Sequence, residues 1–168
     1  MPGDSDRPTA SVQASEPSLL KRREIEARIA VPLIEAFAEK LGRDEALAVA
    51  GKVIQGLACA AGSEVAKKLG ANGTAALAQV VREVWARDGA LEVTILEESD
   101  RKLSFNVTRC AYAELYGKLG MKNFGRCLSC HRDASFAEGF NPRLKLERTQ
   151  TIMEGAPHCD FRFSLFDP

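Results

Sequence analysis

The spacing of apolar residues changes near residue 90, and this change limits the folds that the chain can adopt. Between residues 19 and 89 the apolar side chains recur every three to four positions, which is typical of a helix with one buried face. Later in the chain, several stretches alternate apolar and polar side chains, which is typical of half-buried strands. Helices and strands segregated in this way predict an α+β domain with an antiparallel sheet that is covered on one face.

The first predicted helix begins after residue 18 and carries an apolar stripe. Ser18 can cap this helix and Gly42 can end it, while Pro32 should kink it because proline lacks a backbone N–H donor. Residues at four-residue steps fall along one side of a helix. The residues of this stripe are Ile25, Ile29, Leu33 and Phe37.

Two more helices complete the predicted helical part. The second covers residues 43–70, with a break expected around Gly62, and the third covers residues 73–89. The predicted buried face of the third helix consists of Leu77, Val80, Val81, Val84 and Trp85.

Two hairpins separated by a helix make up the rest of the domain. Each pair of alternating segments is joined by a short polar turn, which favours antiparallel pairing. Residues 109–121 have helical spacing and lie between the hairpins. The predicted strands are residues 91–96 and 102–108 in the first hairpin, and residues 143–153 and 159–165 in the second.

Length and charge place further bounds on the protein. With 168 residues, the chain is expected to form one domain over residues 19–168, preceded by a disordered tail at residues 1–18 that is rich in Pro and Ser. The 23 basic and 23 acidic residues balance, so charge gives no reason to expect a nucleic-acid or membrane partner. The start of the chain lacks the basic and apolar regions of a secretion signal, which predicts a cytoplasmic protein.

The segment "GRCLSCHRD" contains a Cys-x-x-Cys-His motif formed by Cys127, Cys130 and His131. This motif occurs in c-type haem attachment, in zinc sites and, as Cys-x-x-Cys, in redox dithiols. Haem attachment normally follows export, which disfavours it here, and the parallel-strand context of a redox dithiol is missing. No cofactor is therefore expected. If zinc were bound, the candidate ligands would be Cys127, Cys130, His131, His158 and Cys159.

A nucleophilic thiolate is the third chemistry that the cysteines allow. Five cysteines in a cytoplasmic protein are expected to be reduced thiols. Such a thiolate needs a neighbouring base and an acid. The candidates are Cys159 or Cys130 as nucleophile, His131 or His158 as base, and Asp133 or Asp160 as acid.

Arg148 stands out because strand alternation directs it toward the core. It shares parity with Leu144 and Leu146, and so does Gln150. An unpaired buried guanidinium would cost several kcal/mol, so it needs a carboxylate or a wet cavity. Two interpretations remain open: a clamp for a ligand carboxylate, or a pair with a protein acid. The candidate acids are Asp133, Glu114 and Asp160.

The last third of the chain resembles a known enzyme family. The stretch "FNVTRCAYAELYGKLG", the segment from "CLSC" to "GFNP" and the ending "RTQTIMEGAPHCDFRF" resemble the L-2-amino-thiazoline-4-carboxylic acid hydrolase family. The match covers roughly residues 100–165. The matching elements are Cys110 before a helix, Cys130-x-x-Asp133, Arg148-Thr149 with Thr151, Gly155, and Cys159-Asp160-Phe161.

This resemblance implies a bacterial cytoplasmic hydrolase that opens a small cyclic isothiourea acid to N-carbamoyl-L-cysteine. The attacking group would be a thiolate or an activated water. The implied partner is therefore a small molecule with a carboxylate, and self-association is left open. The implied catalytic residues are Cys159, Asp133, Asp160 and Cys130, and the implied substrate-binding residues are Arg148, Thr149, Thr151, Asn106 and Cys110.

The predicted order of elements also resembles the fold of the 4-vinyl reductase and trafficking-complex proteins. Members of that wider group mostly bind small apolar ligands or partner proteins. An alternative function is therefore a non-catalytic ligand-binding or regulatory module of the same fold, with or without a stabilising zinc ion.

Overall fold

A computed structural model describes residues 16–167. Its α-helices are α1 (Leu19–Leu41), α2 (Arg43–Leu69), α3 (Thr74–Val80), α4 (Ala111–Lys118), α5 (Lys122–Gly125) and α6 (Arg132–Phe140). Its strands are β1 (Leu91–Glu98), β2 (Lys102–Cys110), β3 (Leu144–Glu147) and β4 (Cys159–Leu165). Two π-helical turns, η1 (Val81–Trp85) and η3 (Arg126–Cys130), and two 3-10 turns, η2 (Arg87–Gly89) and η4 (Ile152–Glu154), connect them. The predicted tail lies outside the described residues, apart from residues 16–18.

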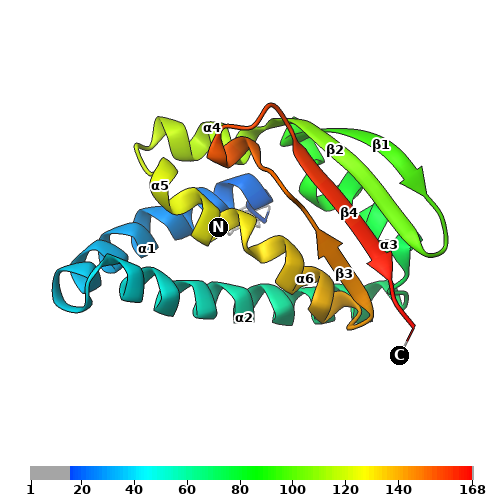
Figure 1. The fold of residues 1–168 in the computed structure, drawn as a ribbon, viewed down its shortest axis with the longest axis horizontal. Helices are drawn as coiled ribbons and strands as arrows, with labels where there is room; N and C mark the ends of the chain where they lie inside the picture. The colour runs from blue at the N-terminus through cyan, green and yellow to red at the C-terminus, as the bar shows by residue number, and fades with distance from the viewer. Residues whose placement is uncertain (1–15, 168) are drawn as a thin grey trace, which may run out of the picture.

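The four strands form one antiparallel sheet in the order β1-β2-β4-β3, and the α+β prediction is confirmed. The sheet occupies the right half of Figure 1, and α2 runs below it. At the centre, Phe105 of β2 faces Phe161 of β4, and their rings stack with centroids 4.7 Å apart. Helices α3 and α6 cover this apolar face, while the opposite face carries polar side chains.

Helices α1 and α2 form an antiparallel pair joined at Gly42. The Ser18 side chain accepts a hydrogen bond from the Lys21 backbone N–H, as expected of an N-cap, and Gly42 has a φ of 85° at the turn. Helix α1 continues through Pro32 to Leu41.

The apolar stripe of α1 lies on the outer side of the helix. Its four side chains are 45–61% exposed, because the helix buries a different and narrower face. That buried face consists of Ala27, Val31 and Ile34.

Helix α2 crosses α6 at a point where the two backbones nearly touch. A Cβ on Gly62 would come within 2.1 Å of the Phe136 carbonyl oxygen, and a Cβ on Gly139 within 1.9 Å of the Cys59 carbonyl oxygen. The predicted break at Gly62 is wrong, since α2 is continuous to Leu69. Glycine is needed there for close approach, not for a bend.

Two other predicted elements end earlier than the sequence pattern indicated. The third helix is regular only over α3 and then widens into the π turn η1, which leaves Val84 37% exposed instead of buried. The strand predicted over residues 143–153 stops at Glu147. Beyond it, the Asp160 side chain accepts hydrogen bonds from the backbone N–H groups of Thr149 and Gln150, in place of strand pairing.

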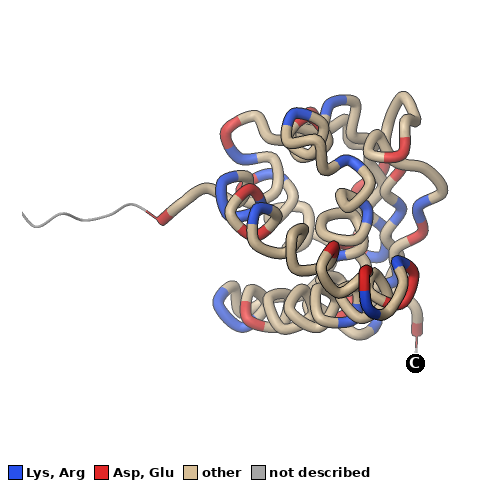
Figure 2. The backbone as a smooth tube through the Cα atoms, turned by 90° about the vertical axis from the view of Figure 1, so that its left-hand side faces the viewer, with Lys and Arg blue, Asp and Glu red and all other residues tan. Residues whose placement is uncertain are grey.

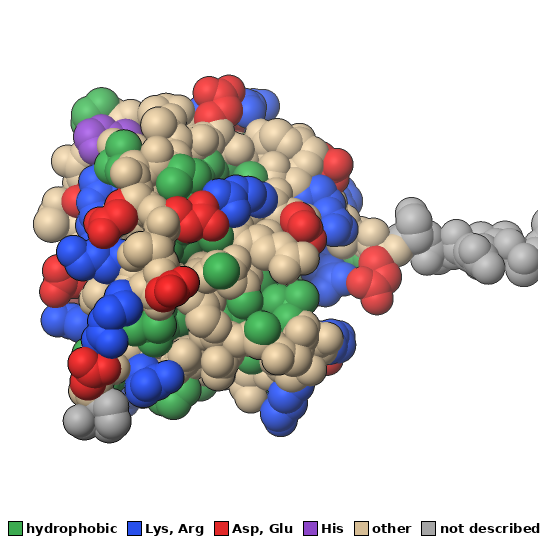
Figure 3. Space-filling model, turned by 90° about the vertical axis from the view of Figure 1, so that its right-hand side faces the viewer, with side chains coloured by type: hydrophobic (Ala, Val, Ile, Leu, Met, Phe, Trp, Pro, Cys, Tyr) green, Lys and Arg blue, Asp and Glu red, His purple; other side chains and the backbone are tan. Residues whose placement is uncertain are grey.

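By length and composition alone, α2 is the one helix among the described residues that is long and apolar enough to span a membrane. It packs against α1 on one side and α6 on another. Charged residues of both signs are interspersed along the chain, and neither sign dominates the face shown in Figure 3. The predicted cytoplasmic location stays a prediction.

Candidate active site

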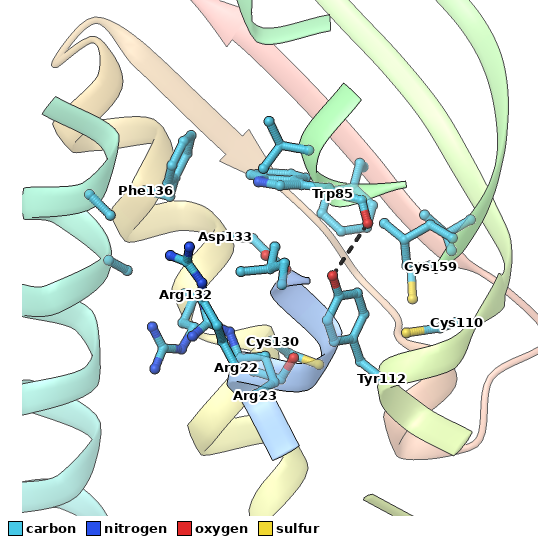
Figure 4. A pocket seen from close by; sticks show the side chains of 18 of the residues that line it. Arg22, Arg23, Trp85, Cys110, Tyr112, Cys130, Arg132, Asp133, Phe136 and Cys159 are labelled. Carbon is cyan, nitrogen blue, oxygen red and sulfur yellow. Dashed lines mark hydrogen bonds between the residues drawn. The ribbon is translucent and has the colours of Figure 1, made fainter. Parts of the chain in front are cut away.

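A cavity of about 410 Å³ lies between the helices and the inner face of the sheet. Its residues come from α1, α2, η1, β1, β2, α4, η3, α6 and β4, and from the segment after β3 (Figure 4). The two π turns both contribute, with Trp85 from η1 and Cys130 from η3. The apolar part of the wall includes Leu57, Val84, Trp85, Val107, Phe136 and Phe161. A mostly apolar cavity of this volume is typical of small-molecule sites.

Arg148 lines this cavity but is already bound to protein groups. Its Nη1 donates to Asp133 Oδ2 at 2.5 Å and its Nη2 to the Cys130 carbonyl at 2.9 Å. The guanidinium also lies over the Phe161 ring, 4.8 Å from the centroid. The interpretation in which Arg148 pairs with a protein acid therefore holds, and the acid is Asp133. The charge of Arg148 is therefore balanced by a carboxylate within the protein.

Asp133 is the less exposed of the two acidic side chains that line the cavity, at 23% against 44% for Glu26. Burial raises the pKa of this carboxyl above its ordinary value, and the opposing charges of Arg148, Arg23 and Arg132 do not fully offset that effect. A carboxyl with a raised pKa holds its proton more tightly than an exposed carboxyl, which suits a group that exchanges protons with a ligand in the cavity.

A group of arginines stands at one end of the cavity, where α1 begins. Arg23 and Arg132 both donate to Oε2 of Glu26, at 2.5 and 2.8 Å, and their side chains are only 16% and 12% exposed. Arg22 lies beside them in Figure 4 and is half exposed. One carboxylate cannot neutralise two guanidinium groups, so this end carries surplus positive charge. Burial and the neighbouring Arg23 accordingly lower the pKa of Arg132.

Three of the five cysteines, Cys110, Cys130 and Cys159, also line the cavity. Burial raises the pKa of the Cys110 thiol to about 11, and it raises the pKa of Cys130 and Cys159 as well. The Ile152 backbone N–H donates to the Cys159 sulfur at 3.2 Å, which opposes the effect of burial. All three groups are consequently neutral thiols at neutral pH, which is unfavourable for a nucleophilic thiolate.

Four other residues that the resemblance assigned to the site lie away from the cavity wall. Asp160 binds the Thr149 hydroxyl at 2.7 Å and the two backbone N–H groups described above, so it fixes the loop after β3. Partial burial opposes ionisation of Asp160, but these hydrogen bonds outweigh it and lower the pKa. Thr151 caps η4 by accepting from the Glu154 N–H. Asn106, on the outer face of the sheet, accepts from Arg162.

The candidate zinc ligands are divided among separate places. Cys127 and His131 line a second hollow, beside α2, whereas Cys130 and Cys159 face the main cavity. His158 contacts Gln150. Within residues 16–167, no group of three or more His, Cys, Asp or Glu side chains is placed to hold a metal ion.

Sequence reasoning missed Arg23 and Arg132. A signal for the first was present, because the opening turn of α1 contains the run Lys21-Arg22-Arg23 and no acidic residue. Cations at a helix N-terminus are unfavourable with the helix dipole, so their presence there points to a use other than helix stability. Arg132 adjoins Asp133 in the sequence, but its approach to α1 depends on the tertiary fold.

The fold and the cavity define a class of α+β proteins that is represented among solved structures. The phenol-responsive sensory domain of the transcription activator PoxR, in a structure with phenol, has a TM-score of 0.54 and 12% identity over 83% of this chain and 73% of that one. Subunit 3 of a trafficking protein particle complex from Naegleria fowleri, covalently bound to palmitic acid, has a TM-score of 0.52 and 13% identity over 88% and 96%. These similarities confirm the predicted fold.

The sequence assigns the chain to one family within that class. The pattern of the L-2-amino-thiazoline-4-carboxylic acid hydrolase family matches residues 22–163, and the chain belongs to this family. The matched range includes the cavity arginines and Asp133. None of the curated proteins matches the chain.

Proposed function

We propose that the protein is a hydrolase that opens a small cyclic amidine or isothiourea ring bearing a carboxylate, such as L-2-amino-thiazoline-4-carboxylate. The observation that carries the proposal is a cavity in which a partly buried acid, Asp133, stands next to arginines with surplus positive charge. Membership of the hydrolase family supports the reaction class.

In this proposal the carboxylate clamp is formed by Arg23 and Arg132, because these two arginines share the single carboxylate of Glu26, whereas Arg148 has the carboxylate of Asp133 as its own partner. Arg148 is instead a positioning residue for Asp133. This assignment differs from the one that the family resemblance implied.

The reaction begins when a water molecule adds to the ring carbon between nitrogen and sulfur. Asp133 takes the proton of the water and passes it to the ring nitrogen. The carbon–sulfur bond then breaks, the sulfur gains the remaining hydroxyl proton, and a urea and a free thiol result. The whole sequence adds one water and needs no oxidant or reductant. We place water in the attacking role because burial keeps the three cavity thiols protonated.

Incubation of the purified protein with L-2-amino-thiazoline-4-carboxylate tests the proposal. A thiol should appear, detectable by disulfide exchange, together with a product heavier by one water in mass spectrometry. Asp133→Asn should lower the rate by about 100-fold or more, within the range for loss of a general acid–base. Absence of thiol release from the unaltered protein, or full activity of Asp133→Asn, would contradict the proposed roles.

A second candidate function is a non-catalytic ligand-binding module. It is favoured by the apolar walls and the protonated thiols, and by the phenol and palmitic acid named for the two structural neighbours. Mass spectrometry of a ligand before and after incubation separates the two functions, because a binding module returns its ligand unchanged.

A further inference from the structure

We infer that the natural ligand of this cavity is an amphipathic acid, whose carboxylate binds at Arg23 and Arg132 and whose apolar body is larger than a thiazoline ring. The inference rests on the proposed use of the cavity as the substrate site. It deepens that proposal by naming the chemical class of the substrate.

The size of the cavity is the first argument. At the ~30 Å³ that one water occupies in the liquid, 410 Å³ has room for roughly 14 waters or heavy atoms of similar size. The amino-thiazoline carboxylate contains about nine non-hydrogen atoms. A substrate of that size would leave roughly a third of the space to water.

The chemistry of the unfilled part is the second argument. Past the Arg148–Asp133 pair, the wall consists largely of apolar surface from η1 and the sheet, including Val107, Phe161 and the Trp85 ring. Water in such a space gains few hydrogen bonds, so its displacement by an apolar group is favourable. A polar substituent would lose its own hydration there and find few partners to replace it.

The position of charge is the third argument. The surplus arginines stand at the end of the cavity where α1 begins, next to the exposed Arg22 (Figure 4). On the α2 side, Leu57 lines the cavity while remaining 57% exposed, so the cavity opens toward solvent there. A ligand with one anionic end and one apolar end therefore matches the cavity in a single orientation.

Binding of simple probe acids tests the ligand class without catalysis. We expect 4-phenylbutyrate to bind at least tenfold more tightly than butyrate, which lacks the apolar body, and than 4-phenylbutanol, which lacks the charge, by isothermal titration calorimetry. Arg23→Gln should weaken binding of the acid but leave that of the alcohol unchanged. If butyrate binds as tightly as 4-phenylbutyrate, or if 4-phenylbutyrate does not bind, the inference is wrong.

Two neighbouring alanines of α2 provide a matched pair of variants. Ala61 is exposed at the surface and lines the cavity, whereas Ala60 is exposed and does not line it. Ala61→Phe should weaken 4-phenylbutyrate binding by about tenfold by filling part of the cavity, and Ala60→Phe should leave it unchanged. Equal effects of the two substitutions would show that the acid binds elsewhere.

Turnover separates this inference from the proposed function. The thiazoline acid and its 5-phenyl derivative are compared as substrates, and the derivative should have the higher kcat/KM. If the unsubstituted ring is the better substrate, the proposed function stands and the inference fails. If neither ring is opened while 4-phenylbutyrate binds as expected, the ligand class stands and the hydrolase proposal fails.

Discussion

Arg148 and Asp133 illustrate what can be learned from single residues. Alternation along the strand directed Arg148 inward, and a buried guanidinium required an acid, but three acids qualified. Asp133 is the partner because α6 places it beside the end of β3, 15 positions away in the sequence. No local sequence pattern indicates that these two residues come together. Asp160 alternates with the buried Cys159 and Phe161 along β4 and therefore points away from the core, where its hydrogen bonds to the loop after β3 explain its presence.

The charge of Arg148 should govern the pH dependence of turnover. A positive neighbour favours the ionised carboxylate, so Arg148→Gln should raise the pKa of Asp133 beyond the increase caused by burial. Since a general base works only when ionised, the acid limb of kcat/KM against pH should move to higher pH, with a loss of more than about tenfold at neutral pH. Arg148→Lys keeps the charge and should keep the limb in place. An unmoved limb in Arg148→Gln would show that another group titrates.

The protonated thiols lead to a second prediction at this scale. If water attacks, Cys130→Ala and Cys159→Ala should each retain kcat within about threefold of the unaltered protein, because neither sulfur forms a bond to the substrate. Steady-state rates with the thiazoline acid measure this directly. A loss of about 1,000-fold in either variant would instead identify that sulfur as the nucleophile.

At the scale of elements, helices and strands follow from periodicity, but their local irregularities do not. Residues 73–89 have helical spacing throughout, and the widening of the chain into η1 at residue 81 leaves no mark in that spacing. It nevertheless directs Trp85 into the cavity wall. Gly62 was likewise ambiguous, because a glycine within a helical pattern fits a break as well as a close contact. Only the position of α6 decides between them.

The crossing of α2 and α6 can be tested with two glycines of the same helix. Gly62→Ala should destabilise the fold by about 1–3 kcal/mol, the usual cost of overpacking, because the added methyl meets the α6 backbone. Gly56 has open space around its Cα, so Gly56→Ala should stabilise by about 0.5–1 kcal/mol through helix propensity. Urea unfolding of the two variants gives both values, and a stable Gly62→Ala protein would refute the close approach.

At the scale of the whole molecule, hydrophobic periodicity identified the stripe on α1 but not the direction that it faces. The helix has a second apolar face made of smaller residues, and that one is buried. Leu33 and Phe37 on the outer face are 52% and 56% exposed, and on α2 Val53 is 59% exposed. An exposed apolar surface of this kind is typical of an interaction site.

The close approach of α2 and α6 at Gly62 and Gly139 also bears on how relatives of this protein can differ in the molecules that they bind. Because the backbones of α2 and α6 are in direct contact at these glycines, the distance between the two helices does not depend on the side chains around the crossing. Substitutions at neighbouring positions of the cavity wall, such as Ala58 and Phe136, can then enlarge or shrink the cavity without changing the distance between α2 and α6. In such a scaffold, single substitutions in the cavity wall can change which ligand binds while the fold stays the same.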